Sequence, residues 1–200
     1  MPNLKTQKNI IYPTVTLKNV FQAFWHGIRP VKWRLFLLII SIVLANIAIT
    51  MVPIFYKQFF DTIVLGGDKT ILAKHLLVFI VCGAIFNGLF WLLYRIATIA
   101  HIQYQPATIA RLRQQAYDHL MEHSYSFFAN NFTGSLVQRV NRFARAFERL
   151  SDDLAWNLLP LIVRVVSILV VIYFVNFWIA FIVLIWAMIF LSFNIIFSKW

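Results

Sequence analysis

Long uncharged stretches divide this sequence and limit what it can fold into. No residue between Arg34 and Lys57 carries a charge, and neither does any residue between His75 and Arg95. A helix of about 20 apolar residues crosses a hydrocarbon core of about 30 Å, and both stretches reach that length. Because 61% of the residues are hydrophobic and only 12% are charged, the sequence excludes an ordinary water-soluble domain. It predicts an all-α polytopic helical bundle in a membrane.

A third apolar stretch begins at position 154, and from there to Trp200 the only charges are Arg164 and Lys199. It is too long for one crossing at about 1.5 Å per residue, so we divide it near Asn176. The second stretch contains small residues that would let a neighbouring helix approach closely, at Gly83, Ala84 and Gly88. The four transmembrane helices are predicted at about 35–56, 76–97, 154–175 and 178–197.

The distribution of basic residues predicts the topology. The 18 Lys and Arg residues exceed the 7 Asp and Glu residues and give a formal net charge of +11. They gather before the first span and between the second and third, so the positive-inside rule places both chain ends in the cytoplasm. The charge is thus a topology signal, and no nucleic acid is expected as a partner. We expect a multi-pass protein of the cell membrane, and because no targeting leader is visible, a bacterial-type inner membrane is favoured.

Residues 1–34 are predicted to form a cytoplasmic leader that contains one amphipathic helix. Thr16 is available as the N-cap of this helix. Its apolar side consists of Leu17, Val20, Phe21, Phe24, Trp25 and Ile28, and its polar side of Lys18, Asn19, Gln22 and His26. This division predicts a helix that lies at the membrane interface. The alternative, a core helix of a small N-terminal domain, is weaker because the short polar segment before it cannot build a core.

The connection between spans two and three, residues 98–153, is too long and too regular for a simple loop. Its first arm shows helical spacing with a bend expected at Pro106, through Ile102, Ile109, Leu112, Ala116 and Leu120. Its second arm follows a pattern that runs directly into span three, through Leu136, Val140, Phe143, Phe147, Leu150 and Leu154. Two long helices should therefore project from the membrane as a cytoplasmic hairpin.

Breaker residues and aromatic residues are mixed where the two arms meet. Asn130, Asn131 and Gly134 surround the rings of Phe127, Phe128 and Phe132. Aromatic side chains displayed at a cytoplasmic tip would need a partner. The alternative is a hydrophobic staple that only closes the hairpin.

Two strings in this region resemble the cytoplasmic loop between helices two and three of type I ABC exporters. They are Leu120-Met121-x-x-Ser124-x-x-Phe127-Phe128 and Gly134-x-Leu136-x-x-Arg139-Val140. The end of span one, Pro53-x-x-x-Lys57-x-x-x-Asp61, is also similar to the family's pattern. The order of these strings, and their spacing relative to the four spans, make the combination fairly specific. The resemblance covers nearly the whole chain, and residues 35–200 would be the transmembrane domain.

This resemblance implies a function. The tip would contain a short coupling helix that docks onto a nucleotide-binding domain of the same or another chain. A second exporter half, identical or different, would complete the transporter. The residues expected to couple the two domains are Phe127, Phe128, Asn130, Asn131, Phe132 and Gly134.

The sequence also departs from the family. About four residues after Arg139 the family has an Asp, whereas this chain has Phe143. Family members have six membrane helices and an ATPase domain, but no G-x-x-x-x-G-K-[ST] occurs here, and the segment 66–70, Gly-Gly-Asp-Lys-Thr, is a turn. We therefore expect the N-terminal part of a longer transporter with no catalytic site or cofactor of its own, and with ATP and Mg bound in the missing domain.

Arg164 lies in the middle of span three, about 16 Å from its outer end. A charge there costs about 2.5 to 3.5 kcal/mol on insertion scales, so it should face a partner or a wet cavity. It could hold an anionic group, such as a lipid phosphate or carboxylate, in the translocation cavity. Equally, it could pair with a carboxylate or with carbonyls on helices that this sequence lacks.

No metal site is expected. His119 and His123 are neighbours on one helix face, but no H-E-x-x-H order follows, and a solvated face explains them better. Cys82 is the single cysteine, which excludes an internal disulfide and a cysteine metal cluster. The alternative to an exporter is a self-contained four-helix membrane scaffold or small channel subunit. The long hairpin, and the lack of an obvious partner for Arg164 among these helices, argue against that alternative.

Overall fold

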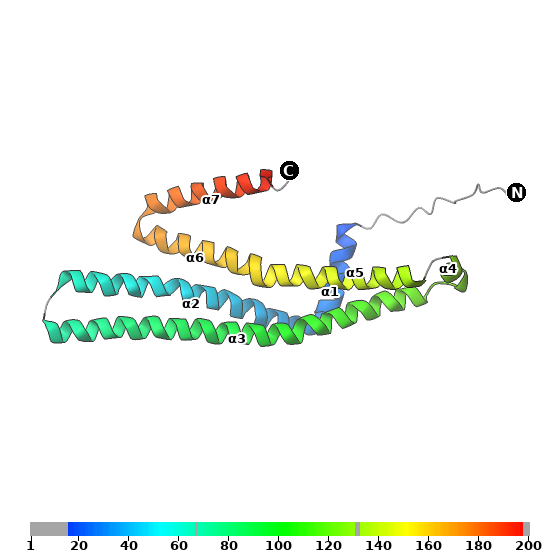
Figure 1. The fold of residues 1–200 in the computed structure, drawn as a ribbon, viewed down its shortest axis with the longest axis horizontal. Coiled ribbons are helices and arrows are strands. Elements are labelled where there is room, and N and C mark those ends of the chain that lie inside the picture. The colour runs from blue at the N-terminus through cyan, green and yellow to red at the C-terminus, as the bar shows by residue number, and fades with distance from the viewer. Residues whose placement is uncertain (1–15, 67, 131–132, 198–200) are drawn as a thin grey trace.

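The computed structural model describes residues 16–66, 68–130 and 133–197, and all of its regular elements are helices (Figure 1). The prediction of an all-α membrane bundle is confirmed. A 3-10 turn, Arg29–Val31, precedes α2, and a π-helical segment, Asp153–Leu158, joins α5 to α6. The α-helices are α1 (Leu17–Ile28), α2 (Lys32–Leu65), α3 (Lys69–Met121), α4 (Tyr125–Asn130), α5 (Thr133–Asp152), α6 (Leu159–Val175) and α7 (Phe177–Phe197).

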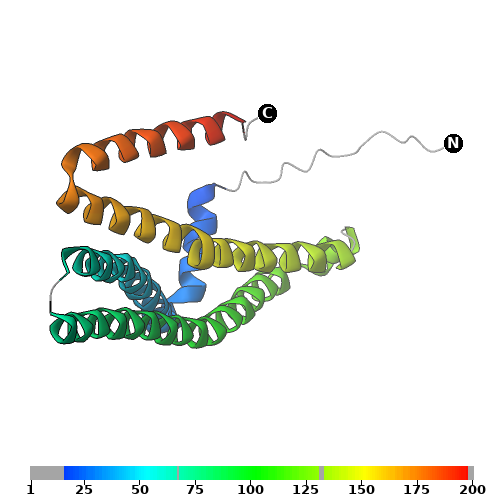
Figure 2. The same ribbon diagram turned by 60° about the vertical axis from the view of Figure 1, so that its left-hand side comes forward.

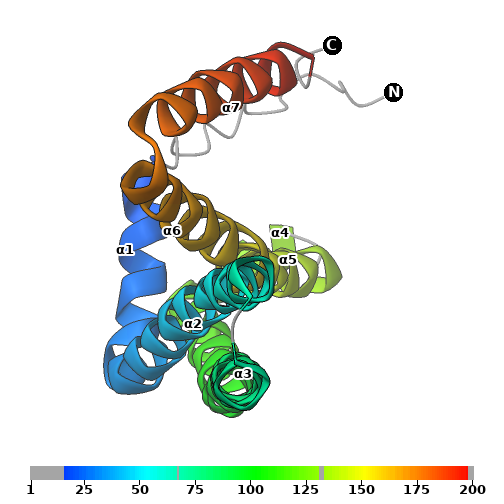
Figure 3. The same ribbon diagram turned by 90° about the vertical axis from the view of Figure 1, so that its left-hand side faces the viewer.

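Helices α2 and α3 form an antiparallel pair, and α6 packs against α2. Viewed along the molecule, α6 lies between this pair and α7 (Figure 3). Three helical stretches of the described residues are long and apolar enough to cross a membrane, namely Leu17–Leu65, Lys69–Met121 and Gly134–Val175. The fourth predicted span lies on α7, whose described apolar stretch, Phe177–Phe190, is shorter.

Helix α3 runs without interruption for 53 residues and contains Pro106. It is visibly curved along its length (Figure 2). Because Pro106 has no N–H, the carbonyl of Ile102 receives no helix hydrogen bond from that position, and a bend there is expected. The second apolar span and the first arm of the hairpin are therefore one continuous element, as the periodicity predicted.

Turn residues end the helices where the sequence indicated. Gly66 terminates α2 with φ at 66°, a left-handed conformation that favours glycine. The Asp68 side chain then accepts a hydrogen bond of 2.8 Å from the Thr70 amide and caps α3. Asn176 separates α6 from α7, and its Oδ1 accepts a 2.9 Å hydrogen bond from the Trp178 amide.

The interior of the described chain lies where α1, α2, α3, α5 and α6 meet. On α2 the polar residues of the first span, Ser41, Asn46 and Thr50, all face inward. Polar groups in a membrane helix are expected on the protein side rather than the lipid side. The buried cluster consists of Phe24, Val31, Leu38, Ile42, Ala97, Ala100, Tyr104, Leu112, Phe147 and Ala155.

The buried face of α3 differs from the predicted one. Ile102 is 64% exposed, although its spacing placed it on the inner stripe. The buried positions in that part of the helix are His101, Tyr104 and Thr108, followed by Leu112 as predicted. The prediction followed aliphatic residues alone, whereas the helix presents polar and aromatic groups to partners on α5. Thr108 needs no such partner, because its hydroxyl donates to its own helix at the Tyr104 carbonyl.

The second arm shows a similar shift. Leu136, Val140 and Phe147 are buried as predicted, but Leu150 and Leu154 are exposed. Ser151 and Ala155 take the inner positions instead. The stripe therefore moves by one residue toward the π segment, where the helical repeat is no longer 3.6 residues per turn.

Among the described glycines, the tightest contact is not at the small residues of the second span. A Cβ on Gly83 would lie 3.7 Å from Tyr56 of α2, an ordinary contact, and one on Gly88 would meet nothing within 4 Å. Ala84 is exposed. The tight approach is at Gly27 of α1, where a Cβ would lie 2.9 Å from Cδ2 of the fully buried Leu112. Gly27 therefore allows α1 to pack on α3.

We predict opposite effects for two glycine substitutions. Gly27→Ala forces Leu112 out of its packed position, and overpacking of this kind costs about 1–3 kcal/mol. Gly88→Ala adds a methyl group to open space in a helix, which should stabilise the chain by about 0.5–1 kcal/mol. Thermal unfolding in detergent micelles measures both. Equal shifts in the two variants would show that α1 does not depend on Gly27 for its packing.

Candidate functional site

The hairpin of α3 and α5 ends in α4, a helix of six residues. Figure 1 shows α4 at the end of the molecule opposite the turn between α2 and α3. We call residues 121–134 the tip. Of the residues expected to couple, Phe127, Phe128 and Asn130 lie on α4, and Gly134 is exposed at the start of α5. Asn131 and Phe132 lie outside the described residues.

Three aromatic rings in the described part of the tip, His123, Phe127 and Phe128, pack in a row. The rings of His123 and Phe127 lie 4.3 Å apart, and those of Phe127 and Phe128 meet edge to face at 5.6 Å. Both phenylalanines are half-buried rather than fully displayed. Phe127 thus packs on its neighbours within the tip, and part of Phe128 remains accessible.

Among the described side chains of the tip, the most exposed apolar ones belong to residues that the sequence analysis did not select for coupling. Tyr125 is 88% exposed and Met121 is 76% exposed. Both precede the phenylalanines by a few positions. Met121 ends α3 and Tyr125 begins α4, so the helix break between them could have indicated their exposure.

Helix α1 is fastened to the second arm by aromatic contacts. The ring of Phe24 stacks on Phe143 at 5.3 Å and meets Phe147 edge to face at 5.1 Å. Phe143 is the residue that departs from the family's Asp, and its ring takes part in this packing. The apolar side of α1 is therefore divided, because Phe24 is buried while Leu17, Phe21 and Trp25 remain exposed. Thr16 is the N-cap as predicted, but its side chain makes no capping hydrogen bond.

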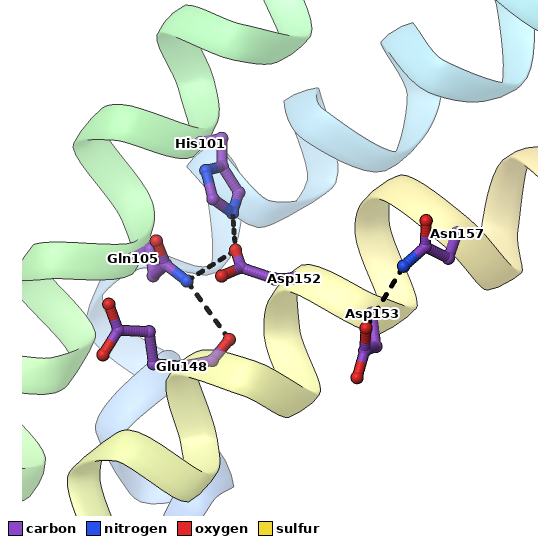
Figure 4. Close-up of polar contacts among 6 residues, drawn as sticks. All are labelled: His101, Gln105, Glu148, Asp152, Asp153 and Asn157. Atoms are coloured by element: carbon purple, nitrogen blue, oxygen red, sulfur yellow. Dashed lines mark hydrogen bonds and ion pairs between the residues drawn. The ribbon is translucent and has the colours of Figure 1, made fainter.

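A polar cluster joins the two arms close to the predicted end of span two (Figure 4). Gln105 of α3 donates to Asp152 Oδ1 at 2.8 Å and to the Glu148 carbonyl at 3.3 Å. His101 Nε2 lies 3.3 Å from the same Asp152 oxygen, at an angle that falls short of a hydrogen bond. The His101 ring also meets the Trp156 ring at 5.2 Å. These contacts hold the first arm against the beginning of the π segment.

Burial governs the protonation of this cluster. His101 lies beyond the predicted span 76–97, and its side chain is 11% exposed. Burial lowers its pKa from the ordinary value, and the charge of Asp152 opposes this effect without cancelling it. Burial also raises the pKa of Tyr104, although its hydrogen bond with Ser151 acts in the opposite direction. At neutral pH, His101 in this polar cluster between the two arms is therefore uncharged.

Pro160 accounts for the π segment. It has no N–H to offer the carbonyl of Trp156, which disfavours regular α-helical bonding at this point. The amide of Leu159, just before it, bonds to the carbonyl of Leu154, five residues earlier. Pro160 lies within the predicted span 154–175, and the sequence analysis did not use this signal.

His119 and His123 make local contacts at the end of α3. His119 Nδ1 lies 3.3 Å from Glu122 Oε2, and His123 Nδ1 lies 3.0 Å from the His119 carbonyl. His119 and Glu122 are each 75% exposed. Within the part of the chain that the structure describes, no group of three or more His, Cys, Asp or Glu residues is arranged so that it could hold a metal ion.

Arg164 has a partner within the chain, which corrects the expectation that these helices offer none. Its Nη2 donates to Oδ1 of Asn46 on α2 at 3.2 Å. Arg164 lies at a cleft of about 450 Å³ between α2 and α6. The cleft is lined by Ile49, Thr50, Pro53, Arg164, Ile168, Val171 and Ile172.

Apolar helices long enough to cross a membrane, joined to a polar hairpin, define a multi-pass membrane protein. Residues 35–200 match the family described as the ABC transporter transmembrane region, and the chain belongs to that family. It is similar to ABC transporter B family member 6 of Dictyostelium discoideum, with 25% identity over 158 residues. The match covers 78% of this chain but 22% of that protein, so the chain spans less than a quarter of its relative's length.

We predict that acid weakens the junction between the arms. His101 in the folded chain has a lowered pKa, so the unfolded chain binds a proton first as the pH falls below about 6.5. The stabilisation is complete above that pH and is lost as the pH falls through the pKa of folded His101. The thermal midpoint of the chain in micelles should therefore drop on acidification, and this drop should shrink in His101→Gln.

His75→Gln is the matched control, because His75 is an exposed histidine near the start of α3. It should leave the pH dependence of the midpoint unchanged. An equal drop in the wild-type chain and in His101→Gln would contradict the assignment of the acid effect to His101.

Proposed function

We propose that this chain is the N-terminal part of the membrane domain of an ATP-driven exporter, and that its tip couples this domain to a nucleotide-binding domain. The carrying observation is the unbroken α3, which connects an apolar span to the tip over 53 residues. An α-helix rises about 1.5 Å per residue, so α3 reaches from the span to the tip as one element. Because its backbone hydrogen bonds resist bending, a displacement at one end is transmitted to the other.

The tip provides the surface for docking. Tyr125 and Met121 are exposed apolar side chains at the end of a long polar hairpin, and aromatic residues often anchor protein interfaces. Phe128 adds a half-buried ring beside them. These residues would insert into a groove of the nucleotide-binding domain, in the same or another chain. ATP and Mg would bind in that domain and supply the energy of transport.

A second exporter half would complete the membrane domain, as an identical or a different chain. Helix α7 supports this proposal because it packs mainly on α6 and leaves Trp178, Trp186 and Phe193 exposed. A membrane helix with so little packing within its own chain can find neighbours in further helices or in a partner. The basic flanks support an orientation with both chain ends in the cytoplasm. The tip would then contact the nucleotide-binding domain on the cytoplasmic side.

Truncation of Tyr125 tests the coupling role. In membranes containing the complete transporter, Tyr125→Ala should lower transport by about tenfold, as expected when an interface anchor worth about 1.4 kcal/mol or more is removed. ATP hydrolysis should continue but lose its dependence on the transported compound. The measurement compares transport and ATPase rates in the same membranes.

Tyr173→Ala is the matched control, since Tyr173 is an exposed tyrosine near the C-terminal end of α6, away from the tip. It should leave the ratio of transport to ATP hydrolysis unchanged. Normal coupling in Tyr125→Ala and in Phe128→Ala would remove the coupling role of the tip.

A further inference from the structure

Arg164 carries a charge that the described chain does not neutralise. Within the described residues, its guanidinium donates a hydrogen bond to the neutral side-chain amide of Asn46. All acidic residues of the sequence lie outside the four predicted spans, at Asp61, Asp68, Asp118, Glu122, Glu148, Asp152 and Asp153. Arg164 is exposed within the described chain, although it lies in the middle of a predicted span, where a charged side chain is expected to face a partner or a water-filled cavity. A cation held by an amide keeps its positive charge available to an anion.

The position of Asn46 is fixed by its own helix. Its Nδ2 donates to the Ile42 carbonyl at 2.8 Å, which directs Oδ1 toward Arg164. Its backbone carbonyl accepts from the Thr50 hydroxyl at 2.7 Å, and Asn46 is 0% exposed. Asn46 is therefore a positioning residue that holds the guanidinium at the edge of the cleft and does not neutralise it.

The cleft beside Arg164 offers an apolar wall and polar groups at one place. Ile168, Val171 and Ile172 of α6 line it with aliphatic surface. On α2, Pro53 has no N–H, so the carbonyl of Ile49 receives no helix hydrogen bond from that position. Both residues line the cleft. A volume of about 450 Å³ falls within the range of small-molecule sites, about 300–1,000 Å³.

We propose that this cleft binds an amphiphile with a single anionic head, a carboxylate, phosphate or sulfonate, and an apolar tail. The head would pair with Arg164 and the tail would lie along α6. A phospholipid resting in the bilayer keeps its head at the interface, about 15 Å from the middle of the hydrocarbon core. The occupant is therefore a compound that has left the bilayer surface for the transport pathway, so the inference rests on the proposed exporter function.

Photo-crosslinking in lipid nanodiscs tests this proposal without ATP hydrolysis. The probe is an alkyl sulfonate with a diazirine in its tail, and the nanodiscs contain only zwitterionic phosphatidylcholine. Mass spectrometry should locate the label on residues that line the cleft, such as Ile168 and Ile172. An alcohol with the same tail should label these positions about tenfold less, as expected when a charge-assisted hydrogen bond is lost.

Three variants separate binding from folding. Arg164→Gln should reduce sulfonate labelling of the cleft by about tenfold, and Arg164→Lys should retain most of it. Asn46→Asp keeps the acceptor for Arg164 but neutralises its charge, so it should reduce labelling as Arg164→Gln does. Lys57→Gln removes an exposed cation from the same chain and should change nothing. Labelling is interpreted only for variants whose thermal unfolding midpoint equals that of the wild-type chain.

The result that overturns the proposal is equal labelling of the wild-type cleft by the sulfonate and the alcohol. Equal sulfonate labelling in the wild type and in well-folded Arg164→Gln and Asn46→Asp would overturn it as well. These outcomes are independent of the test of the tip. If labelling fails but Tyr125→Ala uncouples transport, the exporter carries a different substrate. If labelling succeeds and coupling is unaffected, the anion site stands but the proposed function does not.

Discussion

Lipid offers no hydrogen bond to the polypeptide backbone, and the architecture of this chain depends on that constraint. Except where a proline removes a donor, the amides and carbonyls in a span find their partners within the helix. The polar side chains in these helices follow the same rule. Asn46, Thr50, Asn87 and Ser192 each donate to the carbonyl four residues earlier in their own helix. They can therefore occupy apolar segments without a partner on another helix.

Arg164 is the exception to this local solution. A guanidinium has five N–H donors, and one turn of helix cannot satisfy them. The contact with Asn46 joins residues that are 118 positions apart in the sequence. The sequence alone placed the charge at the middle of span three and required a partner or a cavity. It could not identify Asn46, because a hydrogen bond between two helices depends on how they rotate against each other.

Helix limits were predictable because the chain is strongly punctuated. Gly66 with Asp68, and later Asn176, break long apolar runs that leave no other choice. The inner faces were less predictable. The pattern of aliphatic residues selected Ile102, but the polar neighbours Gln105 and Asp152 favour His101 at the contact. Counting hydrophobic residues cannot detect a face that is held partly by polar groups.

The tip and the first helix show a second limit. The rings of Phe127 and Phe128 were visible in the sequence, but the packing of Phe127 on His123 and on Phe128 was not. Tyr125 is more accessible than either phenylalanine. Likewise, the apolar side of α1 gave the helix its amphipathic pattern. Only the fold shows that the Phe24 ring contacts the rings of Phe143 and Phe147 on α5, while Trp25 beside it is exposed.

The π segment sets the direction in which the tip points around the axis of its helix. In an α-helix each residue turns the chain by about 100°, so the number of residues between Asp152 and Leu159 determines the angle between the inner face of α5 and that of α6. Here the segment Asp153–Leu158 is π-helical, with hydrogen bonds that span five residues, and this bonding sets the angle between the two inner faces. Insertion or removal of one residue in it would leave both helices intact but rotate one relative to the other. The spatial relation of membrane cleft and tip is thus encoded in the length of a single turn.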